Sequence, residues 1–364
     1  MKPTGNSRNR LWSKAAAAGL AAALASASTA ALAAKDIKLT VLSGYAPNAA
    51  WVRVFKEYWM PEVNRRLAEK GAYNIVYTEA FGTVVKPRGE LDGVQQGLGD
   101  IGLVVTAFHA DKFPLESISF VTPFVSTDAA LNARTYDALA AKFPKWRDNW
   151  DRYNMVLLGY MGSVPNYAVL SRAPIKTIDD LKGKKIAGAG LNLRWVEGIG
   201  ATGVPSALTK FYSDTKSGVS DGMLAWGDAV GAFKLCEAGP YFLKLSMGAV
   251  TSFAVAANKR TWNGLPDEVR TVMKDVTARY RDELARQATA GDSKGLDACK
   301  AQGGTIVEMS DGERQRWAAA LPNIAKEWAD DADKRGFPGN EALKAYMDIM
   351  RDNKQPIARH WDRK

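Results

Sequence analysis

The polar side chains best suited to binding a small molecule lie just after predicted short strands. Asn192 and Arg194 follow a predicted strand at 184–187, and Asp228 follows another at 223–226. A guanidinium and an amide can donate hydrogen bonds to an anion, and a carboxylate can accept them from a ligand. Because ligands of α/β proteins bind at the carboxyl ends of parallel strands, this arrangement predicts a small-molecule site.

Other candidate ligand-binding side chains lie near the ends of further predicted strands. Asn166 adds a hydrogen-bonding amide, Arg88 adds a positive charge, and aromatic residues would form the walls of the site. Ordinary core packing is the alternative for each aromatic residue, and a solvated helix position is the alternative for Arg194. The complete predicted ligand-binding set is Tyr45, Trp51, Phe81, Arg88, Thr106, Phe108, Asn166, Asn192, Arg194, Trp195, Trp226 and Asp228.

Catalytic and metal-binding motifs are missing from the sequence. Its histidines are His109 and His360, and it has no HExxH, paired CxxC, EF-hand, GxSxG or P-loop pattern. We therefore expect a protein that binds without reacting, with no catalytic residues, no metal and no cofactor. A hydrolase that uses a pair of carboxylates without a sequence signature remains an alternative.

The amino terminus has the features of a secretory signal peptide. A basic start without acidic residues precedes an alanine-rich run, and residues 31–33 (ALA) fit the small-x-small cleavage pattern. A membrane anchor is the alternative, but alanine contributes little apolar area. We expect residues 1–33 to be removed and the mature chain, 364 minus 33 or 331 residues, to be periplasmic.

Charge and cysteine usage restrict the partners and the compartment. The formal net charge of +10 falls to about +6 without the four basic residues of the signal, which suits an acidic small ligand. The Lys and Arg residues are dispersed among acids, so no nucleic acid partner is expected. Cys236 and Cys299 are far apart in sequence, and an oxidising compartment permits a disulfide between them. Two buried thiols are the alternative.

The predicted elements form two similar α/β units. Strand, loop and helix alternate from residue 37 to residue 106, and again from residue 174 to residue 228. A helix, a glycine, two residues, an aspartate and a strand occur at Gly97 and again at Gly218. Helices are expected at 128–149, 265–299, 311–335 and 340–352, and a strand at 250–257 should return to the first unit.

These pieces together resemble a known family, the solute-binding proteins of tripartite ATP-independent periplasmic (TRAP) transporters, of the dicarboxylate-binding type. The resemblance covers nearly the whole mature chain. It implies a periplasmic-binding-protein-like fold with crossing hinge strands and a long spanning helix, closing over an organic acid and delivering it to TRAP permease subunits in the membrane. The matching pieces are 89–91 (GEL), 97–102 (GLGDIG), 113–115 (FPL), 123–124 (PF), 174–177 (PIKT), 180–186 (DLKGKKI), 200–201 (GA), 217–222 (SGVSDG) and 262–266 (WNGLP).

One departure from the family pattern affects the expected ligand. The family usually places an arginine that pairs with the ligand carboxylate directly after the DLKGxKI piece, where this chain has Ala187. Either Arg194 or Arg88 would then take that place, or the ligand is not a simple dicarboxylate. We expect Arg194 to be the replacement. An exported lyase or hydrolase on the same architecture and the binding protein of an ATP-driven importer are the alternative functions.

The resemblance to this family also implies a domain organisation. Domain I would contain residues 34–158 and 250–264, and domain II would contain residues 159–249. Residues 265–364 would form the long helix and the carboxyl-terminal helices, which pack on both domains.

Overall fold

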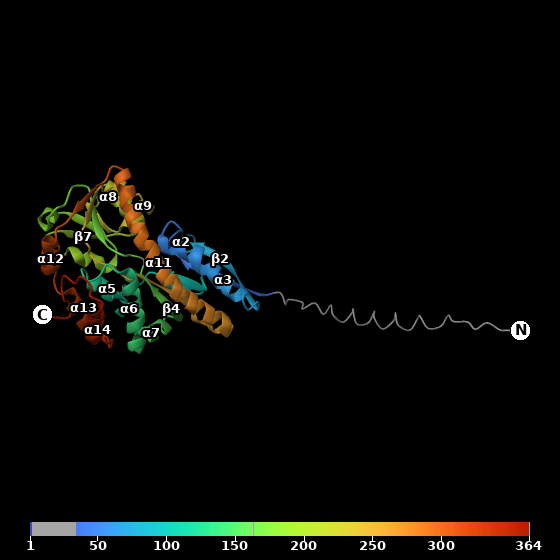
Figure 1. The fold of residues 1–364 in the computed structure, drawn as a ribbon. Helices are drawn as coiled ribbons and strands as arrows, with labels where there is room; N and C mark the ends of the chain where they lie inside the picture. The colour runs from blue at the N-terminus through green and yellow to red at the C-terminus, as the bar shows by residue number, and fades with distance from the viewer. Residues whose placement is uncertain (2–33, 163, 364) are drawn as a thin grey trace.

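Two β-sheets with helices around them form the core of the molecule. The structure, a computed structural model, describes Met1, residues 34–162 and residues 164–363. The predicted signal peptide therefore lies outside the described residues, apart from Met1. Figure 1 shows β2 and α3 on one side of the long helix α11 and β7 and α8 on the other. The predicted α/β fold with two units and a long spanning helix is confirmed.

The first sheet has the strand order β2-β1-β3-β10-β4. β1 pairs in parallel with β2 and β3, whereas β10 runs antiparallel to both β3 and β4. The strand predicted to return to the first unit is therefore present as β10. The strands are β1 (Lys35–Ser43), β2 (Tyr73–Phe81), β3 (Ile101–Val104), β4 (Met155–Met161) and β10 (Phe253–Asn258).

The second sheet has the strand order β11-β9-β5-β8-β6-β7, with β6 parallel to β7 and β8. β7 was not predicted, because it contains Gly203 and Pro205, residue types that usually interrupt a strand. Because β7 is an edge strand, its proline removes no hydrogen bond from an inner ladder. β9 and β11 were also not predicted. The strands are β5 (Ala168–Ser171), β6 (Lys185–Gly188), β7 (Thr202–Pro205), β8 (Gly222–Ala225), β9 (Tyr241–Lys244) and β11 (Thr305–Glu308).

The two predicted glycine–aspartate turns have matching structures. Gly97 and Gly218 have φ angles of 79° and 81°, a left-handed conformation that glycine adopts without strain. Asp100 Oδ2 accepts the backbone N–H of Thr40 at 2.8 Å, and Asp221 Oδ2 accepts that of Lys185 at 2.9 Å. Each aspartate thus connects the start of one strand to a neighbouring strand of the same sheet.

The long helix α11 (Asp267–Ala301, 35 residues) contacts both units. Toward the first unit, Trp59 Nε1 donates a 2.9 Å hydrogen bond to Thr277 Oγ1. Toward the second, Gly295 packs so closely that a Cβ there would lie 1.6 Å from the Gly227 carbonyl oxygen. The helix runs without interruption through Gly291, as predicted.

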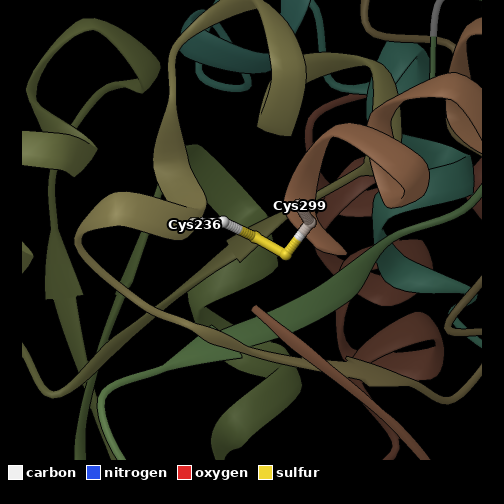
Figure 2. Close-up of a disulfide and its surroundings, with 2 residues drawn as sticks. All are labelled: Cys236 and Cys299. Carbon is white, nitrogen blue, oxygen red and sulfur yellow. A yellow bond between two sulfur atoms is a disulfide. The ribbon is translucent and has the colours of Figure 1, made fainter. Parts of the chain in front are cut away.

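A disulfide joins α11 to the second unit near this close contact. Cys236 and Cys299 are bonded, with their Cα atoms 5.3 Å apart and a sequence separation of 63 (Figure 2). The sequence left the choice between a disulfide and two thiols open, and the structure shows the disulfide.

The remaining helices surround the sheets, and two predicted long helices are each divided. Pro144 starts a new helix after Phe143, and Leu321 and Pro322 separate two helices further on. Proline cannot donate the N–H that a helix interior needs. The α-helices are α2 (Ala50–Val54), α3 (Met60–Ala68), α4 (Glu90–Gln95), α5 (Ile118–Val121), α6 (Ala129–Lys142), α7 (Pro144–Asp151), α8 (Leu208–Lys216), α9 (Gly227–Ala232), α10 (Lys259–Gly264), α12 (Asp311–Ala320), α13 (Ile324–Lys334) and α14 (Gly339–Asp352).

Short helical turns complete the described chain. η1 is a π-helical turn that joins α2 to α3, and the others are 3₁₀ turns. The sequence after Gly190 is typical of a helix, and the structure has the 3₁₀ turn η5 there. The turns are η1 (Phe55–Trp59), η2 (Thr106–Phe108), η3 (Leu115–Ser117), η4 (Ile178–Leu181), η5 (Gly190–Val196) and η6 (Leu235–Glu237).

The carboxyl-terminal segment forms hydrogen bonds with both units. Trp317 Nε1 donates to the Trp195 carbonyl oxygen in the second unit at 2.7 Å, and Trp361 Nε1 donates to the Pro123 carbonyl oxygen at 2.8 Å. β4 runs through residue 158, where we expected a domain boundary, and the domain boundaries stay predictions.

Candidate ligand-binding cavity

A small cavity of about 50 Å³ lies between the two units at the carboxyl ends of parallel strands. Tyr45 lies two residues after β1, and Val105 directly follows β3 in the first sheet. Ala189 directly follows β6, and Trp226 directly follows β8 in the second. Both units therefore contribute the part of an α/β sheet where ligands bind.

Aromatic and aliphatic side chains form almost the whole wall of this cavity. Its polar groups are a serine, two tyrosine hydroxyls and the indole N–H groups of two tryptophans, and no lining residue carries a formal charge. The lining consists of Tyr45, Trp51, Val105, Ala107, Phe108, Phe120, Val164, Tyr167, Ala189, Leu208, Phe211, Trp226, Ser252 and Phe253.

The aromatic rings of the wall contact one another mostly edge to face. Tyr45 and Trp51 have ring centroids 4.9 Å apart at an interplanar angle of 74°, and Tyr167 and Trp226 are 5.4 Å apart at 71°. Such pairs stabilise by more than their buried area alone. They also fix the shape of the wall from both units.

The backbone of Trp51 is bound by the long helix, and its indole N–H has no hydrogen-bond partner among the described residues. Tyr280 Oη, on α11, donates a 2.6 Å hydrogen bond to the Trp51 carbonyl oxygen. The side chain is 6% exposed, and its Nε1 has no hydrogen-bond partner among the described residues. A buried N–H of this kind loses its water without compensation.

Asn192 lies one layer behind the wall with a similar unused donor. Its Oδ1 accepts the backbone N–H of the lining residue Ala189 at 2.8 Å, which closes the turn that begins η5. The side chain is fully buried, and its Nδ2 has no hydrogen bond of good geometry to any described residue. The amide lies beside the Tyr167 hydroxyl. Burial raises the pKa of that hydroxyl, and a weak hydrogen bond from the Asn192 side chain opposes the shift.

Arg88 contacts the wall residue Phe108 from the rim, outside the cavity lining, and it also lines a separate groove. Its guanidinium carbon lies 4.6 Å from the centroid of the Phe108 ring, and the guanidinium forms no ion pair with a described residue. The residue is exposed, and its φ angle of 84° is unusual for a side chain other than glycine. Such strained residues are concentrated at functional sites.

The buried carboxyl of Glu90 fixes the backbone of this rim. Its oxygens accept the backbone N–H groups of Arg88 at 2.9 Å and Gly44 at 3.2 Å. Burial raises the pKa of Glu90 to about 7, against the lowering effect of these hydrogen bonds. Burial, followed by the nearby Glu90 charge, also raises the pKa of the Tyr45 hydroxyl, which stays protonated.

Arg194 lies away from the cavity. Its guanidinium pairs with Glu197 at 3.0 Å and with Glu327 of α13 at 2.8 Å, and these carboxylates raise its pKa although partial burial opposes them. The hypothesis that Arg194 replaces the missing arginine at Ala187 therefore has no geometric support. Arg194 instead connects the second unit to a carboxyl-terminal helix.

The structure brings four predicted residues together in the wall: Tyr45, Trp51, Phe108 and Trp226. Trp195 is fully buried behind the wall, where its Nε1 donates to the Phe120 carbonyl oxygen at 2.5 Å. Thr106 lies between the lining residues Val105 and Ala107 in the chain, and its Oγ1 donates a 3.2 Å hydrogen bond to the Ser252 carbonyl oxygen.

Three other predicted residues have positions outside the wall. Asn166 Oδ1 accepts the Gly248 backbone N–H at 3.2 Å, which supports the chain crossing between the units. Phe81 is buried at the end of β2. Asp228 lines a separate groove with Arg53, and burial raises the pKa of its carboxyl, partly offset by that arginine.

Sequence reasoning missed four aromatic wall residues, Phe120, Tyr167, Phe211 and Phe253. Tyr167 is adjacent to the predicted Asn166, so its place in the chain could have indicated it. The other three belong to a helix or a strand whose apolar pattern is that of ordinary core. Only the packing of the two units identifies them as cavity residues.

His109 and the acidic residues do not form a metal site in the described chain. Burial lowers the pKa of His109, and the nearby positive charge of Lys112 lowers it further. No group of three or more His, Cys, Asp or Glu in the described residues is arranged to hold a metal ion. In that same part of the chain, no helix combines the length and the apolar character that crossing a membrane requires.

The fold and the cavity between strand ends define a two-unit solute-binding protein. The model of the family described as bacterial extracellular solute-binding protein, family 7 (DctP) matches residues 57–331. The chain belongs to this family, and the predicted resemblance is confirmed.

Similar proteins cover nearly the whole chain. The outer membrane transporter protein TsaT of Comamonas testosteroni is 24% identical over 348 residues, which are 94% of this chain and 97% of TsaT. A TRAP solute-binding protein of Rhodoferax ferrireducens, solved with copurified benzoate, has a TM-score of 0.75 at 21% identity, covering 87% and 98% of the two chains. DctP7 of Bordetella pertussis, a receptor binding pyroglutamic acid, has a TM-score of 0.71 at 22% identity, covering 86% and 99%.

Proposed function

We propose that this protein is the periplasmic receptor of a TRAP transporter and that it captures a small organic acid by closing its two units around it. The observation that carries the proposal is the cavity lined by residues following β1 and β3 in one sheet and β6 and β8 in the other. A ligand held there contacts both units, so its binding energy favours their approach.

Burial of the wall supports closure as the route of entry. Tyr45, Trp51, Tyr167 and Trp226 are each between 4% and 6% exposed. A solute from bulk water reaches these rings only when the units move apart, and it becomes enclosed when they come together. The family and the relatives support delivery to membrane permease subunits of the TRAP type as the next step.

Two lines support an acid as the ligand. The relatives described above bind benzoate and pyroglutamic acid. Arg88, at the rim, has a guanidinium free of carboxylate partners in the described chain, and a cation at a cleft mouth raises the local concentration of anions. The relatives give no support to an exported enzyme or to the receptor of an ATP-driven importer.

The test is to identify the solute and to observe closure. Native mass spectrometry of protein purified from the periplasm should detect a retained small acid. The same acid, added to unfolded and refolded protein, should raise the melting temperature and reduce the radius of gyration in small-angle X-ray scattering. A bound acid that is converted to a product, or dimensions that stay unchanged at saturation, would contradict the proposal.

A further inference from the structure

We infer that the cavity selects an acid with an apolar ring and that buried uncharged donors, the Trp51 indole N–H and the Asn192 side-chain amide, bind its acidic group. This inference rests on the proposed function and names the ligand class of the same site. It assigns to neutral hydrogen bonds the role that an arginine at position 187 would otherwise have.

The indole of Trp51 supplies the first donor. Its ring lines the cavity, and its Nε1 is buried without a partner among the described residues. Buried polar groups in folded proteins are nearly always hydrogen-bonded. A ligand oxygen in the cavity satisfies this N–H, so the unpaired group in the empty protein indicates where the acceptor binds.

The amide of Asn192 supplies the second donor. Its orientation is fixed, because the atom that faces the donating N–H of Ala189 must be the amide oxygen. The other amide atom is therefore the NH₂ group, which is buried and has no hydrogen bond of good geometry to a described residue. It lies close enough to the Tyr167 hydroxyl to lower the pKa of that hydroxyl as a hydrogen-bond donor, and its second N–H is left for a ligand. Ala189 and Tyr167 both line the cavity, so Asn192 lies directly behind its wall.

The polarity of the two unpaired groups predicts the polarity of the ligand. Both are donors, and the wall has no carboxylate that could accept a hydrogen bond from a ligand amine. Hydrogen bonds from neutral groups to an ionised oxygen are stronger than those between neutral groups. A carboxylate or a similar oxyanion therefore gains more here than a neutral or cationic group.

The rest of the wall predicts an apolar ring. Phe108, Phe120, Phe211 and Phe253 carry no polar side-chain atoms, and they surround the same space as the two edge-to-face pairs. Burying the hydroxyls or the second carboxylate of a dicarboxylic or sugar acid against these four rings removes hydration that carbon atoms do not replace. An aromatic or alicyclic ring gains from the same burial.

Arg88 is the competing partner for the acidic group. Its guanidinium lies over the Phe108 ring, but the residue is exposed and its charge acts through water. A charge in that position increases the association rate and makes it sensitive to salt, with a small effect on dissociation. Binding of the acidic group by Arg88 and binding by the buried neutral donors therefore predict different effects on the association and dissociation rates.

The first test compares the affinities of two tryptophan variants for ring acids. The probes are benzoate, phenylacetate and mandelate, with succinate and pyroglutamate as acids lacking an aromatic ring, measured by titration calorimetry on the mature chain. Trp51→Phe keeps an aromatic ring and removes the N–H, and we expect the best ring acid to bind about 10- to 100-fold more weakly. Trp226→Phe is the matched control, because Trp226 lines the same cavity with the same 6% exposure but has no buried unpaired N–H. An equal loss in both variants would show that Trp51 acts through packing alone.

The second test changes the donor of Asn192 without removing its acceptor. Asn192→Asp can keep the hydrogen bond from Ala189 and replaces the NH₂ group with an oxygen. We expect the affinity for the best ring acid to fall about 100-fold or more at neutral pH. As the pH falls, protonation of the new carboxyl restores a donor and should recover part of that affinity. A loss that does not depend on pH would indicate a merely structural role.

The third test separates the neutral donors from Arg88 by rates. Arg88→Gln should lower the association rate and its salt dependence while the dissociation rate stays near that of the wild type.

If Arg88→Gln abolishes binding and Trp51→Phe does not, the guanidinium binds the acidic group and the inference is overturned. If succinate or pyroglutamate binds more tightly than benzoate, phenylacetate and mandelate, the inferred ligand class is wrong while the proposed function stands. If no acid binds and none is retained from cells, the proposed function fails as well.

Discussion

The hydroxyl of Tyr280 donates a 2.6 Å hydrogen bond to the backbone carbonyl of Trp51, and this bond connects the long helix α11 to the wall of the cavity. Tyr280 is fully buried and also contacts Phe55 edge to face at 5.5 Å. The helix that contacts both units thus fixes the position of a residue that we propose contacts the ligand.

Tyr280→Phe should lower the free energy of unfolding by about 1 kcal/mol, the typical net value of one hydrogen bond. The loss is small because the Trp51 carbonyl also accepts the backbone N–H of Phe55 and keeps a partner. Ligand affinity should fall by less than in Trp51→Phe, because the indole N–H is still present. Urea denaturation and calorimetry of the variant would measure both effects. A variant with unchanged affinity and stability would show that α11 does not fix Trp51.

The disulfide between Cys236 and Cys299 should provide a large part of the stability of the second unit. For a separation of 63 residues, the chain-entropy model gives about 4 kcal/mol. Unfolding of the protein in guanidinium with and without a reducing agent would measure the difference. The double variant Cys236→Ser with Cys299→Ser should match the reduced protein and no longer respond to the reducing agent. A reduced wild-type protein as stable as the oxidised one would contradict the prediction.

Arg194→Ala should leave ligand affinity within about threefold of the wild type, or roughly 0.7 kcal/mol. The guanidinium pairs with Glu197 and Glu327, and the structure places it outside the cavity lining. Because the side chain is 29% exposed and its partners are more exposed, removing the ion pairs should cost at most about 1 kcal/mol of stability. Titration calorimetry of the variant would measure the affinity. A 100-fold loss would show that Arg194 binds the acidic group of the ligand.

The sequence predicted the fold well because its signals are local. Gly97 and Gly218 close helices in the left-handed conformation just before the turns that lead into β3 and β8, so these short segments specify their own turns. The strands β9 and β11 were not predicted, and pairing within the sheet defines them. β7 was missed because its glycine and proline indicate a break unless its edge position is known.

The candidate site was less predictable because its members come from both units. Tyr45 and Trp226 could be predicted since both closely follow strands, whereas Phe211 and Phe253 look like core residues in their own elements. The place of Arg194 after a glycine turn suggested a cleft residue, but Glu327, 133 residues later (327 minus 194), pairs with it. An ion pair between distant segments has no sequence signature.

The last prediction concerns Glu116, a fully buried carboxyl whose Oε1 accepts hydrogen bonds from Tyr160 Oη at 2.8 Å and Trp150 Nε1 at 3.0 Å. Burial raises its pKa from 4.5 to about 7, and the two hydrogen bonds only partly oppose this. In the folded protein the group holds its proton up to about pH 7, whereas in the unfolded chain it releases it near pH 4.5. The stabilising contribution of the proton is therefore fully present below about pH 4.5 and is lost as the pH rises through about 7.

Glu116→Gln should remove this dependence, because the amide keeps an oxygen acceptor and never ionises. The free energy of unfolding of the wild type should fall relative to the variant by on the order of 3 kcal/mol between pH 4.5 and pH 7. Denaturant melts at several pH values would give the difference curve, with Glu116→Asp as the control that retains a titrating group. Parallel curves for the wild type and Glu116→Gln would mean that Glu116 stays ionised in the core, with Tyr160 and Trp150 sufficient to stabilise its charge.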